Sequence, residues 1–404
     1  MLWKIAWRNL WRNKRRSVII LVSVVVGMVA MMLSDALYTG MIRQVLTNQV
    51  RLEVGHIQIH RRGFHDNPSI KLLIERPEEV EAIIRQQPEI LHYGRRVLTY
   101  GILSSSYNSS GVNMVSVEPE AERKITLISK SIVEGRYLER GAHEVLIGEG
   151  LARKLEVGVG DKLVAMASRL DGSIGSDVFR VVGIYRTFDS EHDKVTMFIP
   201  LETAQHMLGL GQAVSEFVLM VKDVRHVDAV RDSLRRRLPQ VYETLSYRDV
   251  LPLLVYQSEA MAQWMLIYYV IIGIALVFGI VNTMLMAVFE RMQEIGVLKA
   301  IGMPNRKVLA MILLESITLG LLGTVIGVGV GLLIYWPLSH SGLNLSVFSA
   351  SLASFGVGAV IYPVMSLRIL LSAGISIPIV ALVGAVYPAI KAVHFEPVEA
   401  MRYV

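Results

Sequence analysis

The sequence SVIILVSVVVGMVAMML occupies residues 17–33 and contains no charged side chain. A helix that crosses a lipid bilayer needs about 20 mainly apolar residues, and this run continues past Asp35 toward Tyr38. Three more apolar runs of span length follow it in the second half of the chain. The sequence therefore predicts four membrane-spanning helices, at residues 17–39, 264–289, 308–336 and 369–393.

A fifth apolar stretch, residues 345–365, differs from these four because it is rich in Ser and Gly. We interpret residues 337–368 as a loop on the outer side that touches the membrane interface. A fifth span is the alternative.

Composition supports a membrane protein and excludes several other classes. Hydrophobic residues make up 52% of the 404 residues, and the surplus is concentrated in the long runs. The net charge of +6 gives no reason to expect nucleic-acid binding, because much of the excess flanks the apolar runs. The absence of cysteine excludes disulfides, thiolate zinc sites and cysteine nucleophiles.

Lys and Arg near the span ends predict the orientation, because basic loops stay on the cytoplasmic side. Residues 1–16 carry six basic side chains and no acid, residues 290–307 hold Arg291, Lys299, Arg306 and Lys307, and the end of the chain has Lys391 and, in the tail 394–404, Arg402. Four spans place these segments inside. They place residues 40–263 on the outer side of the membrane.

The segment 1–16 is expected to form an amphipathic helix on the inner leaflet. Trp3, Trp7 and Trp11 recur at helical spacing, and Arg8 and Arg12 recur on another face. Trp prefers the membrane interface, and Arg prefers anionic lipid headgroups. The apolar run that follows is too long for the core of a cleaved signal peptide, so we expect a retained anchor.

Residues 40–263 alternate strand-like and helix-like segments, which predicts an α+β domain of more than one lobe. Both ends of this segment enter spans, so we expect it to stand on two helical stalks, near 35–50 and 247–263. Strands are expected at 54–60, 97–106, 112–117, 144–147, 162–167, 179–185, 196–199 and 217–221, and helices at 78–85, 150–155, 201–208 and 227–238.

No catalytic motif is found in this sequence. There is no Gly-Lys dipeptide and therefore no phosphate-binding P-loop, and neither H-E-x-x-H nor G-x-S-x-G occurs. His56 and His60 are expected on one strand face, which would allow a metal, but a solvated face is the preferred interpretation. The acids at Glu118, Glu120 and Glu122 are expected in a solvated loop. Asp35 is expected to be the only acid close to the interior of a span.

The segment 290–304, ERMQEIGVLKAIGMP, is short and amphipathic. Gly302 suits the end of a helix and Pro304 the first turn of the next one. It fits either a helix across the cytoplasmic face or a plain connection.

The pattern E-R-x-x-E-I-G-x-L-K-A-I-G in this segment resembles the signature of the FtsX-like permeases, which include the MacB and the lipoprotein-releasing LolC/LolE types. The segments VGHIQ (54–58), EVLIGEGLARKLEVGVGD (144–161) and FRVVGIYRT (179–187) are similar to parts of the exported domain, the last two to the LolC/LolE type. The tail from Tyr387 resembles the ending of the final span, with Met401 where Leu is common.

This resemblance implies a dimer with a second identical or homologous permease and two cytoplasmic ATPases. ATP and Mg would be bound by the ATPases, so this chain would be a non-enzymatic subunit without a cofactor. The implied ATPase-coupling residues are Glu290, Arg291, Glu294, Gly296, Lys299 and Gly302. The implied cargo is a lipoprotein or similar lipid-anchored molecule, handled on the outer side by force from the stalks. Export through a periplasmic adaptor, or activation of a cell-wall hydrolase by a signalling scaffold, are the alternatives.

The lipoprotein-releasing type carries a hook that binds a chaperone, and residues 168–177 lie at its position. This loop is shorter here and lacks proline, and it begins with Ser168, Arg169, Leu170, Asp171, Gly172 and Ser173.

Gly323, Gly327 and Gly331 are spaced four apart in the third predicted span. Small residues at this spacing let two helix backbones approach closely in lipid. The partner would be another span of the same chain or the second permease.

Overall fold

The computed structural model describes residues 14–348, 358 and 360–394. The described chain divides into two compact units. We call residues 14–42, 257–344 and 360–394 the membrane unit, and residues 43–256 with 345–348 and 358 the sheet domain. The predicted interfacial residues Trp3, Trp7, Arg8, Trp11 and Arg12, and the tail after His394, lie outside the described residues.

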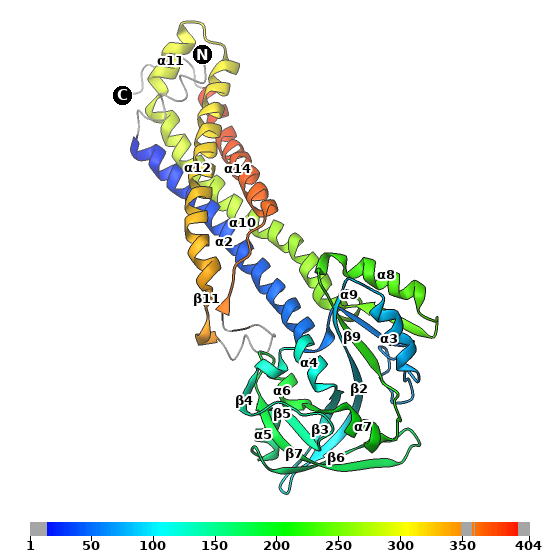
Figure 1. Cartoon of the computed structure of the whole chain (residues 1–404). Coiled ribbons are helices and arrows are strands. Elements are labelled where there is room, and N and C mark those ends of the chain that lie inside the picture. The colour runs from blue at the N-terminus through cyan, green and yellow to red at the C-terminus, as the bar shows by residue number, and fades with distance from the viewer. Residues whose placement is uncertain (1–13, 349–357, 359, 395–404) are drawn as a thin grey trace. The chain divides into compact units, whose positions relative to one another are not determined.

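Four helices in the described chain are long and apolar enough to cross a membrane, which confirms the predicted membrane fold (Figure 1). They are α2 (Lys14–Gln49), α10 (Pro252–Glu290), α12 (Asn305–Ser341) and α14 (Leu367–His394). Most of the stretch suggested as a fifth span, residues 349–357 and 359, lies outside the described residues. Its end contributes the short strand β12 (Val360–Ile361), which pairs with β11 (Leu343–Asn344).

Two of these helices are longer than the spans predicted from sequence. α2 continues without a break beyond the predicted end of the first span to Gln49, and α10 begins at Pro252, twelve residues before the predicted second span. The second predicted stalk does not begin as part of α10, because α9 (Tyr247–Val250) is a separate turn that ends at Leu251. The first span and its stalk therefore form one helix, and the second span shares one helix with its stalk from Pro252 onward.

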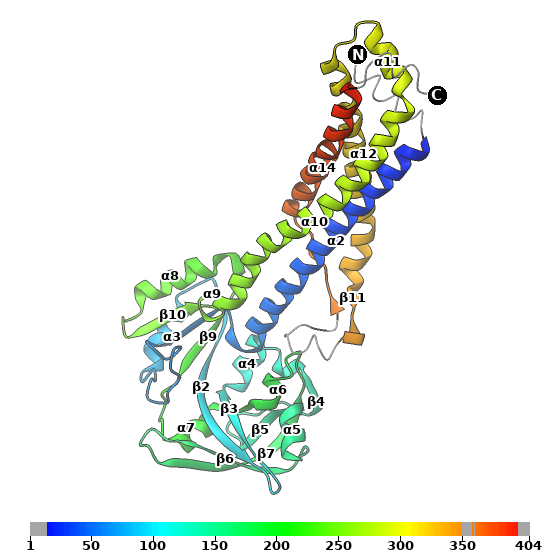
Figure 2. The same cartoon turned by 180° about the vertical axis from the view of Figure 1, so that it is seen from behind.

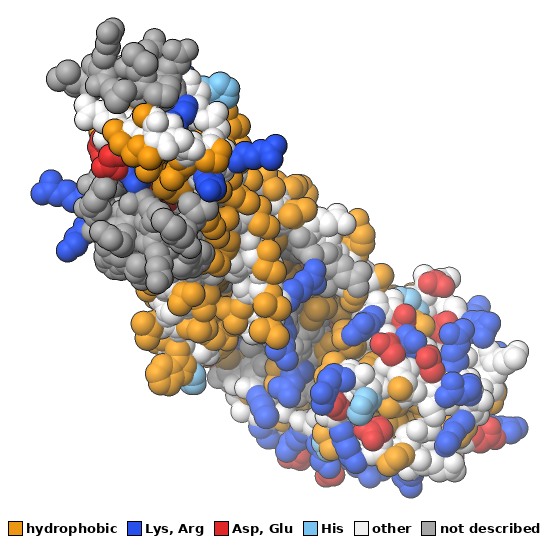
Figure 3. Space-filling model, turned by 90° about the horizontal axis from the view of Figure 1, so that it is seen from above, with side chains coloured by type: hydrophobic (Ala, Val, Ile, Leu, Met, Phe, Trp, Pro, Cys, Tyr) orange, Lys and Arg blue, Asp and Glu red, His pale blue; other side chains and the backbone are white. Residues whose placement is uncertain are grey.

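Hydrophobic side chains cover the surface of the membrane helices, whereas Lys, Arg, Asp and Glu are interspersed over the sheet domain (Figure 3). In a bilayer, helices gain little from burying apolar groups against each other, so close packing and hydrogen bonds hold them together. α14 presents small residues such as Ala373, Ala381 and Ala385 inward, and all three are buried. Ser316 Oγ on α12 donates a hydrogen bond to the carbonyl oxygen of Ala381 at 2.7 Å.

A ten-stranded mixed sheet runs through the sheet domain (Figures 1 and 2). The strand order is β10-β1-β9-β2-β3-β8-β5-β7-β4, and β6 pairs with β2 and β7. Only β3 with β8 and β5 with β7 are parallel pairs among the described strands. The strands are β1 (Ile57–Arg61), β2 (Ile90–Ser104), β3 (Ser109–Val117), β4 (Ile132–Gly135), β5 (Glu144–Gly148), β6 (Lys162–Ser168), β7 (Ile174–Tyr185), β8 (Thr196–Pro200), β9 (Glu216–Val221) and β10 (Tyr242–Ser246).

Short helices pack on this sheet, and the domain is one compact unit rather than the several lobes that the sequence suggested. The helices are α3 (Pro77–Arg85), α4 (Pro119–Ile125), α5 (Glu149–Leu155), α6 (His192–Val195), α7 (Leu201–Leu208) and α8 (Val227–Arg237). Apolar side chains from nearly all the strands and from α3, α5, α7 and α8 form the main core.

The first strand begins later than predicted. Residues 50–54 form a π-helix, Val50–Val54, that follows directly on α2, and β1 begins only at Ile57. Gly55 ends this turn with φ +69°, a backbone angle that side-chain-bearing residues rarely adopt. The predicted strand at 54–60 is therefore wrong at its start, because the stalk helix unwinds through one wide turn before the sheet.

A buried ion-pair network fixes this turn to the sheet. Arg96 on β2 donates two hydrogen bonds to Glu122 on α4, at 2.6 and 3.1 Å, and one to Glu216 on β9 at 3.3 Å. It donates a fourth, at 2.5 Å, to the backbone carbonyl oxygen of Glu53 in the π-helix. All three ionisable side chains are buried, so the prediction that Glu122 lies in a solvated loop is wrong.

The network holds two carboxylates for one guanidinium. Burial raises the pKa of Glu216 to about 7, although Arg96 opposes this shift. Burial in itself disfavours the Arg96 cation, but the carboxylates of Glu122 and Glu216 more than compensate and raise its pKa. Near pH 7, Glu216 therefore exchanges a proton while Arg96 stays charged.

We expect Glu216→Gln to stabilise the protein at alkaline pH. The folded state binds the Glu216 proton more tightly than the unfolded chain, so this stability is present below the ordinary pKa of 4.5 and is lost as the pH rises through about 7. A neutral amide avoids that loss, and we expect a gain of roughly 1–3 kcal/mol at pH 8 and little at pH 4. Thermal unfolding at a series of pH values measures it.

Glu202→Gln is the matched control, because the Glu202 side chain is about half exposed. A gain for Glu216→Gln that does not change with pH would contradict a protonated buried carboxyl.

Candidate functional site

The short helix that the segment 290–304 suggested is present as α11 (Met292–Ala300), between α10 and α12 (Figure 1). Glu290 is the last residue of α10, and Arg291 leaves the helical conformation with φ −106° and ψ 17°. Gly302 has φ +97° and ends the segment after α11. The local chemistry therefore makes α11 a separate helix between two long ones.

The segment of α11 has a buried face and an exposed face, and apolar side chains lie on both. Met292, Ile295 and Gly296 are buried. Val297 is 46% and Ile301 79% exposed. The expected coupling residue Gly296 thus lies on the inner face, so a bulky residue there would disturb this chain's own packing before it met a partner.

Two expected coupling residues make contacts within the chain. Arg291 donates to Glu315 on α12, 3.1 Å away, and to Glu294 at 3.4 Å. Lys299 Nζ donates to the backbone carbonyl oxygen of Val393 at the end of α14, at 2.8 Å. These bonds tie α11 to two membrane helices. The expectation that Asp35 is the only acid near a span interior is wrong, because Glu315 lies within α12.

The glycine face of α12 packs on α2 of the same chain. A Cβ atom added at Gly323 would lie 2.4 Å from Val24 Cγ1, and one at Gly327 would lie 2.8 Å from Met28 Cβ. Gly331 faces Met32 in the same way. Of the two partners that the sequence left open, the structure places a span of the same chain against this face.

Asp35 forms a polar cluster near one end of the membrane unit. Its carboxylate accepts a hydrogen bond from the hydroxyl of Tyr269 on α10. Thr39 Oγ1 on α2 also donates to it, at 3.4 Å. Ser34 and Tyr268 share a second α2–α10 hydrogen bond at 2.9 Å. The cluster joins the two helices that lead into the sheet domain.

The hook position is occupied by a tight hairpin. β6 ends at Ser168 and pairs there with Ile174, so Ile174–Asp177 belongs to β7 and not to a loop. Asp171 accepts a hydrogen bond from the backbone N–H of Ser173 at 2.9 Å, and Gly172 has φ +85°. Leu170 N donates to Leu208 O at the end of α7, at 3.3 Å. The expected ten-residue loop is therefore a turn of five residues, folded against α7.

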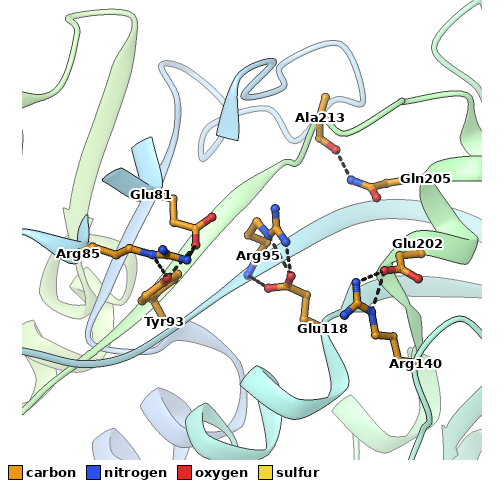
Figure 4. Close-up of polar contacts among 9 residues, drawn as sticks. All are labelled: Glu81, Arg85, Tyr93, Arg95, Glu118, Arg140, Glu202, Gln205 and Ala213. Atoms are coloured by element: carbon orange, nitrogen blue, oxygen red, sulfur yellow. Dashed lines mark hydrogen bonds and ion pairs between the residues drawn. The ribbon is translucent and has the colours of Figure 1, made fainter. Parts of the chain in front are cut away.

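An open groove of about 720 Å³ lies in the sheet domain near the ends of β3 and β8. Charged side chains in it form pairs, shown in Figure 4, in which Arg95 contacts Glu118 and Arg140 contacts Glu202. On neighbouring elements, Arg85 and Glu81 both bind the hydroxyl of Tyr93, and Gln205 binds the carbonyl of Ala213. Sequence reasoning missed this groove, because its walls come from segments far apart in the chain.

The expected solvated histidine face is wrong at His60. His60 is 1% exposed, and its Nδ1 lies 3.0 Å from Glu243 Oε1. His56 precedes β1, and its Nδ1 accepts a hydrogen bond from Val221 N at 3.0 Å. Among the residues that the structure describes, no group of three His, Cys, Asp or Glu side chains could hold a metal ion.

Two family models match the chain and together cover most of it. Residues 17–237 match the MacB-like periplasmic core domain, which is more than half of the chain. Residues 266–397 match the FtsX-like permease C-terminal region.

Curated relatives agree with these matches at modest identity. An uncharacterized ABC transporter permease of Methanocaldococcus jannaschii is 25% identical over 67% of this chain and 65% of its own length. The lipoprotein-releasing system transmembrane protein LolC of Neisseria meningitidis is 24% identical over 76% and 77%. The macrolide export ATP-binding/permease protein MacB of Bdellovibrio bacteriovorus is 28% identical over 77% and 46%. The chain thus spans less than two thirds of the length of two of these relatives.

Among solved structures, the periplasmic region of MacB from Actinobacillus actinomycetemcomitans aligns with a TM-score of 0.38 and 15% identity. The alignment covers 50% of this chain and 94% of that region. At this score the likeness adds nothing to the family matches.

The glycine face gives a test of packing inside the chain. We expect Gly327→Leu to destabilise the membrane unit by about 1–3 kcal/mol, because the added atoms meet Met28 close to its backbone. Gly329→Leu, two residues along the same helix, adds its side chain where no atom lies within 4 Å and should change little. Thermal unfolding in detergent compares the two, and equal losses would contradict the α2–α12 contact.

Proposed function

This chain belongs to the MacB/FtsX/LolC family of ABC transporter permeases, and we propose that it drives the release of lipoproteins or similar lipid-anchored cargo from the outer leaflet of a bacterial inner membrane. The work would come from a separate cytoplasmic ATPase. The LolC-type relatives and the segments similar to the lipoprotein-releasing type support this cargo.

One observation carries the proposal: α2 is a single helix from Lys14 to Gln49, through the first span and into the sheet domain. A continuous helix is stiff along its axis, so a shift at one end is passed to the other. At its far end the π-helix is held by Arg96, and Leu127 N donates to Arg51 O at 3.0 Å. Movement of α2 would therefore reach the sheet and α4 through these bonds.

The proposed orientation places α11 and both termini in the cytoplasm and the sheet domain in the periplasm. α11 would then meet the ATPase with its outer face, which carries Glu294, Val297 and Ile301. ATP and Mg would bind to the ATPase, because this sequence contains no P-loop.

The hairpin at the hook position weighs against capture of a chaperone by a protruding loop. It is compact and bonded to α7. Handover to a periplasmic chaperone would therefore use another surface of the sheet domain. The groove near β3 and β8 offers one with paired charges.

A MacB-like efflux permease that works with a periplasmic adaptor is the second candidate. It is favoured by the match of residues 17–237 to the MacB-like periplasmic core domain. A signalling scaffold that activates a cell-wall hydrolase is the third, and the FtsX-like match supports it. Proteoliposomes that hold the permease, its ATPase and a lipoprotein separate the first from both others, because only the first predicts ATP-dependent release of the lipoprotein.

Breaking the α2 stalk tests the proposed transmission. We expect insertion of two glycines after Ile42 to leave ATP hydrolysis by the complex active but to lower lipoprotein release about tenfold or more, because glycine is the most flexible helix residue. Two glycines inserted after Gly172, in the exposed hairpin turn, are the matched control. The permease without its ATPase should hydrolyse no ATP, and undiminished release with the broken stalk would overturn the proposal.

The outer face of α11 gives a second test. We expect Val297→Asp combined with Ile301→Asp to weaken co-purification of the ATPase about tenfold, because charges would replace exposed apolar contacts. Val224→Asp, at a residue of the sheet domain that is 48% exposed, is the control. Gly296→Trp should instead lower thermal stability. Unchanged association of the double variant would contradict docking through this face.

A further inference from the structure

One face of α10 combines exposed apolar residues with an exposed amide. Its stripe consists of Ile271, Ala275, Phe278, Asn282 and Phe289, all of which are exposed. The spacings of four, three, four and seven residues place these side chains on one side of the helix. The exposed fraction is 62% at Ile271 and 72% at Phe278.

Asn282 is the unusual member of this stripe. It lies eight residues before the end of the span that closes at Glu290, which is about 12 Å along a helix and within the hydrocarbon region. No hydrogen bond to its side chain is found among the described residues. A bare amide in lipid is costly, because no water can satisfy it there.

Other polar side chains of the membrane helices solve this problem locally. Thr283 Oγ1 donates to Gly279 O at 2.7 Å, and Ser23 Oγ donates to Ile19 O at 2.9 Å. Such back-bonding suits a short hydroxyl, whereas the amide of Asn282 has both donors and an acceptor to satisfy. Its partner must therefore come from outside the described chain.

The same face has room for a close neighbour. A Cβ atom added at Gly279 would meet nothing within 4 Å. The glycines of α12 that pack closely, Gly323 and Gly327, are already covered by α2 of the same chain. A second helix can thus approach α10 beside Asn282, but it cannot use the α12 glycine face.

We propose that this stripe of α10 packs against the same stripe of a second copy of the chain, with the two Asn282 amides hydrogen-bonded to each other. Two copies with the same membrane topology are related by a two-fold axis along the membrane normal, which places parallel helices with identical residues opposite one another. An amide both donates and accepts, so it is its own complement across such an axis. A single Asn in an otherwise apolar helix seam fixes register and pairing in this way.

This inference deepens the proposed function, because it names the surface through which the permease pairs. It also links the two sheet domains, since each α10 continues to Pro252. The seam does not depend on the nature of the cargo.

Cysteine crosslinking of the full-length chain, which has no native cysteine, tests the seam in nanodiscs without ATPase or cargo. We expect Ala275→Cys and Phe278→Cys to form disulfide-linked dimers on oxidation with copper phenanthroline. The controls are Val325→Cys on α12 and Val383→Cys on α14, which are 71% and 54% exposed, and these should stay monomeric. In the Ala275→Cys background, Asn282→Leu should weaken dimerisation roughly 3- to 30-fold, whereas Asn282→Gln should retain most of it.

Three results would overturn the proposal. These are crosslinking of Val325→Cys or Val383→Cys as efficient as that on α10, no effect of Asn282→Leu, or crosslinks in native membranes to a different polypeptide only. Because cargo release is not measured, the seam can fail while the proposed function stands, and the reverse is also possible. Asn282→Leu places an apolar side chain on a lipid-facing surface, so it should fold, and the cysteine variants on α10 report independently of it.

Discussion

Everything in this chain depends on the requirement that backbone polar groups in a bilayer be hydrogen-bonded within their own segment. α2 and α10 meet this requirement as uninterrupted helices, and both continue beyond the length that a bilayer needs. Residues 43–256 of the sheet domain are inserted in the chain between the membrane-spanning parts of these two helices.

The first of these helices, α2, leads into a π-helix that is held to the sheet by the buried ion pairs of Arg96. A buried guanidinium bound to two carboxylates is costly to desolvate, and hydrophobic replacements of such groups often stabilise proteins. Its presence is thus weak evidence for stability. What Arg96 adds is geometry, because one side chain on β2 binds the π-helix, β9 and α4 at the same time. Because burial raises the pKa of Glu216 to about 7, the charge of this network changes near neutral pH.

The sequence predicted the elements with strong local signals and missed those that depend on distant residues. The spans followed from the length of the apolar runs, and α3 and α7 were predicted to within one residue. Glu122 was predicted to lie in a solvated loop, because nothing local in the sequence indicates that it is buried together with Arg96. The burial of Gly296 on α11 could not be predicted either, because the sequence alone does not show which face of this helix packs inside the chain. The hairpin at the predicted hook position depends on strand pairing between Ser168 and Ile174, which the sequence did not indicate.

Two kinds of residue favour contacts between helices in the membrane unit: glycines, which allow close packing, and polar side chains, which form hydrogen bonds. Small residues can serve any close helix contact, so the spacing of Gly323 and Gly327 could not by itself distinguish a neighbour within the chain from one outside it. In this structure α2 fills that face. An amide is more specific than a glycine, because in lipid it demands a polar partner at a defined position. Asn282 on α10 is exposed, whereas Ser316 on α12 is buried and donates a hydrogen bond to the carbonyl oxygen of Ala381. In the described part of α12, Glu315 and Ser316 are paired inside the chain, whereas Asn282 on α10 is the exposed amide through which we propose that a second copy binds.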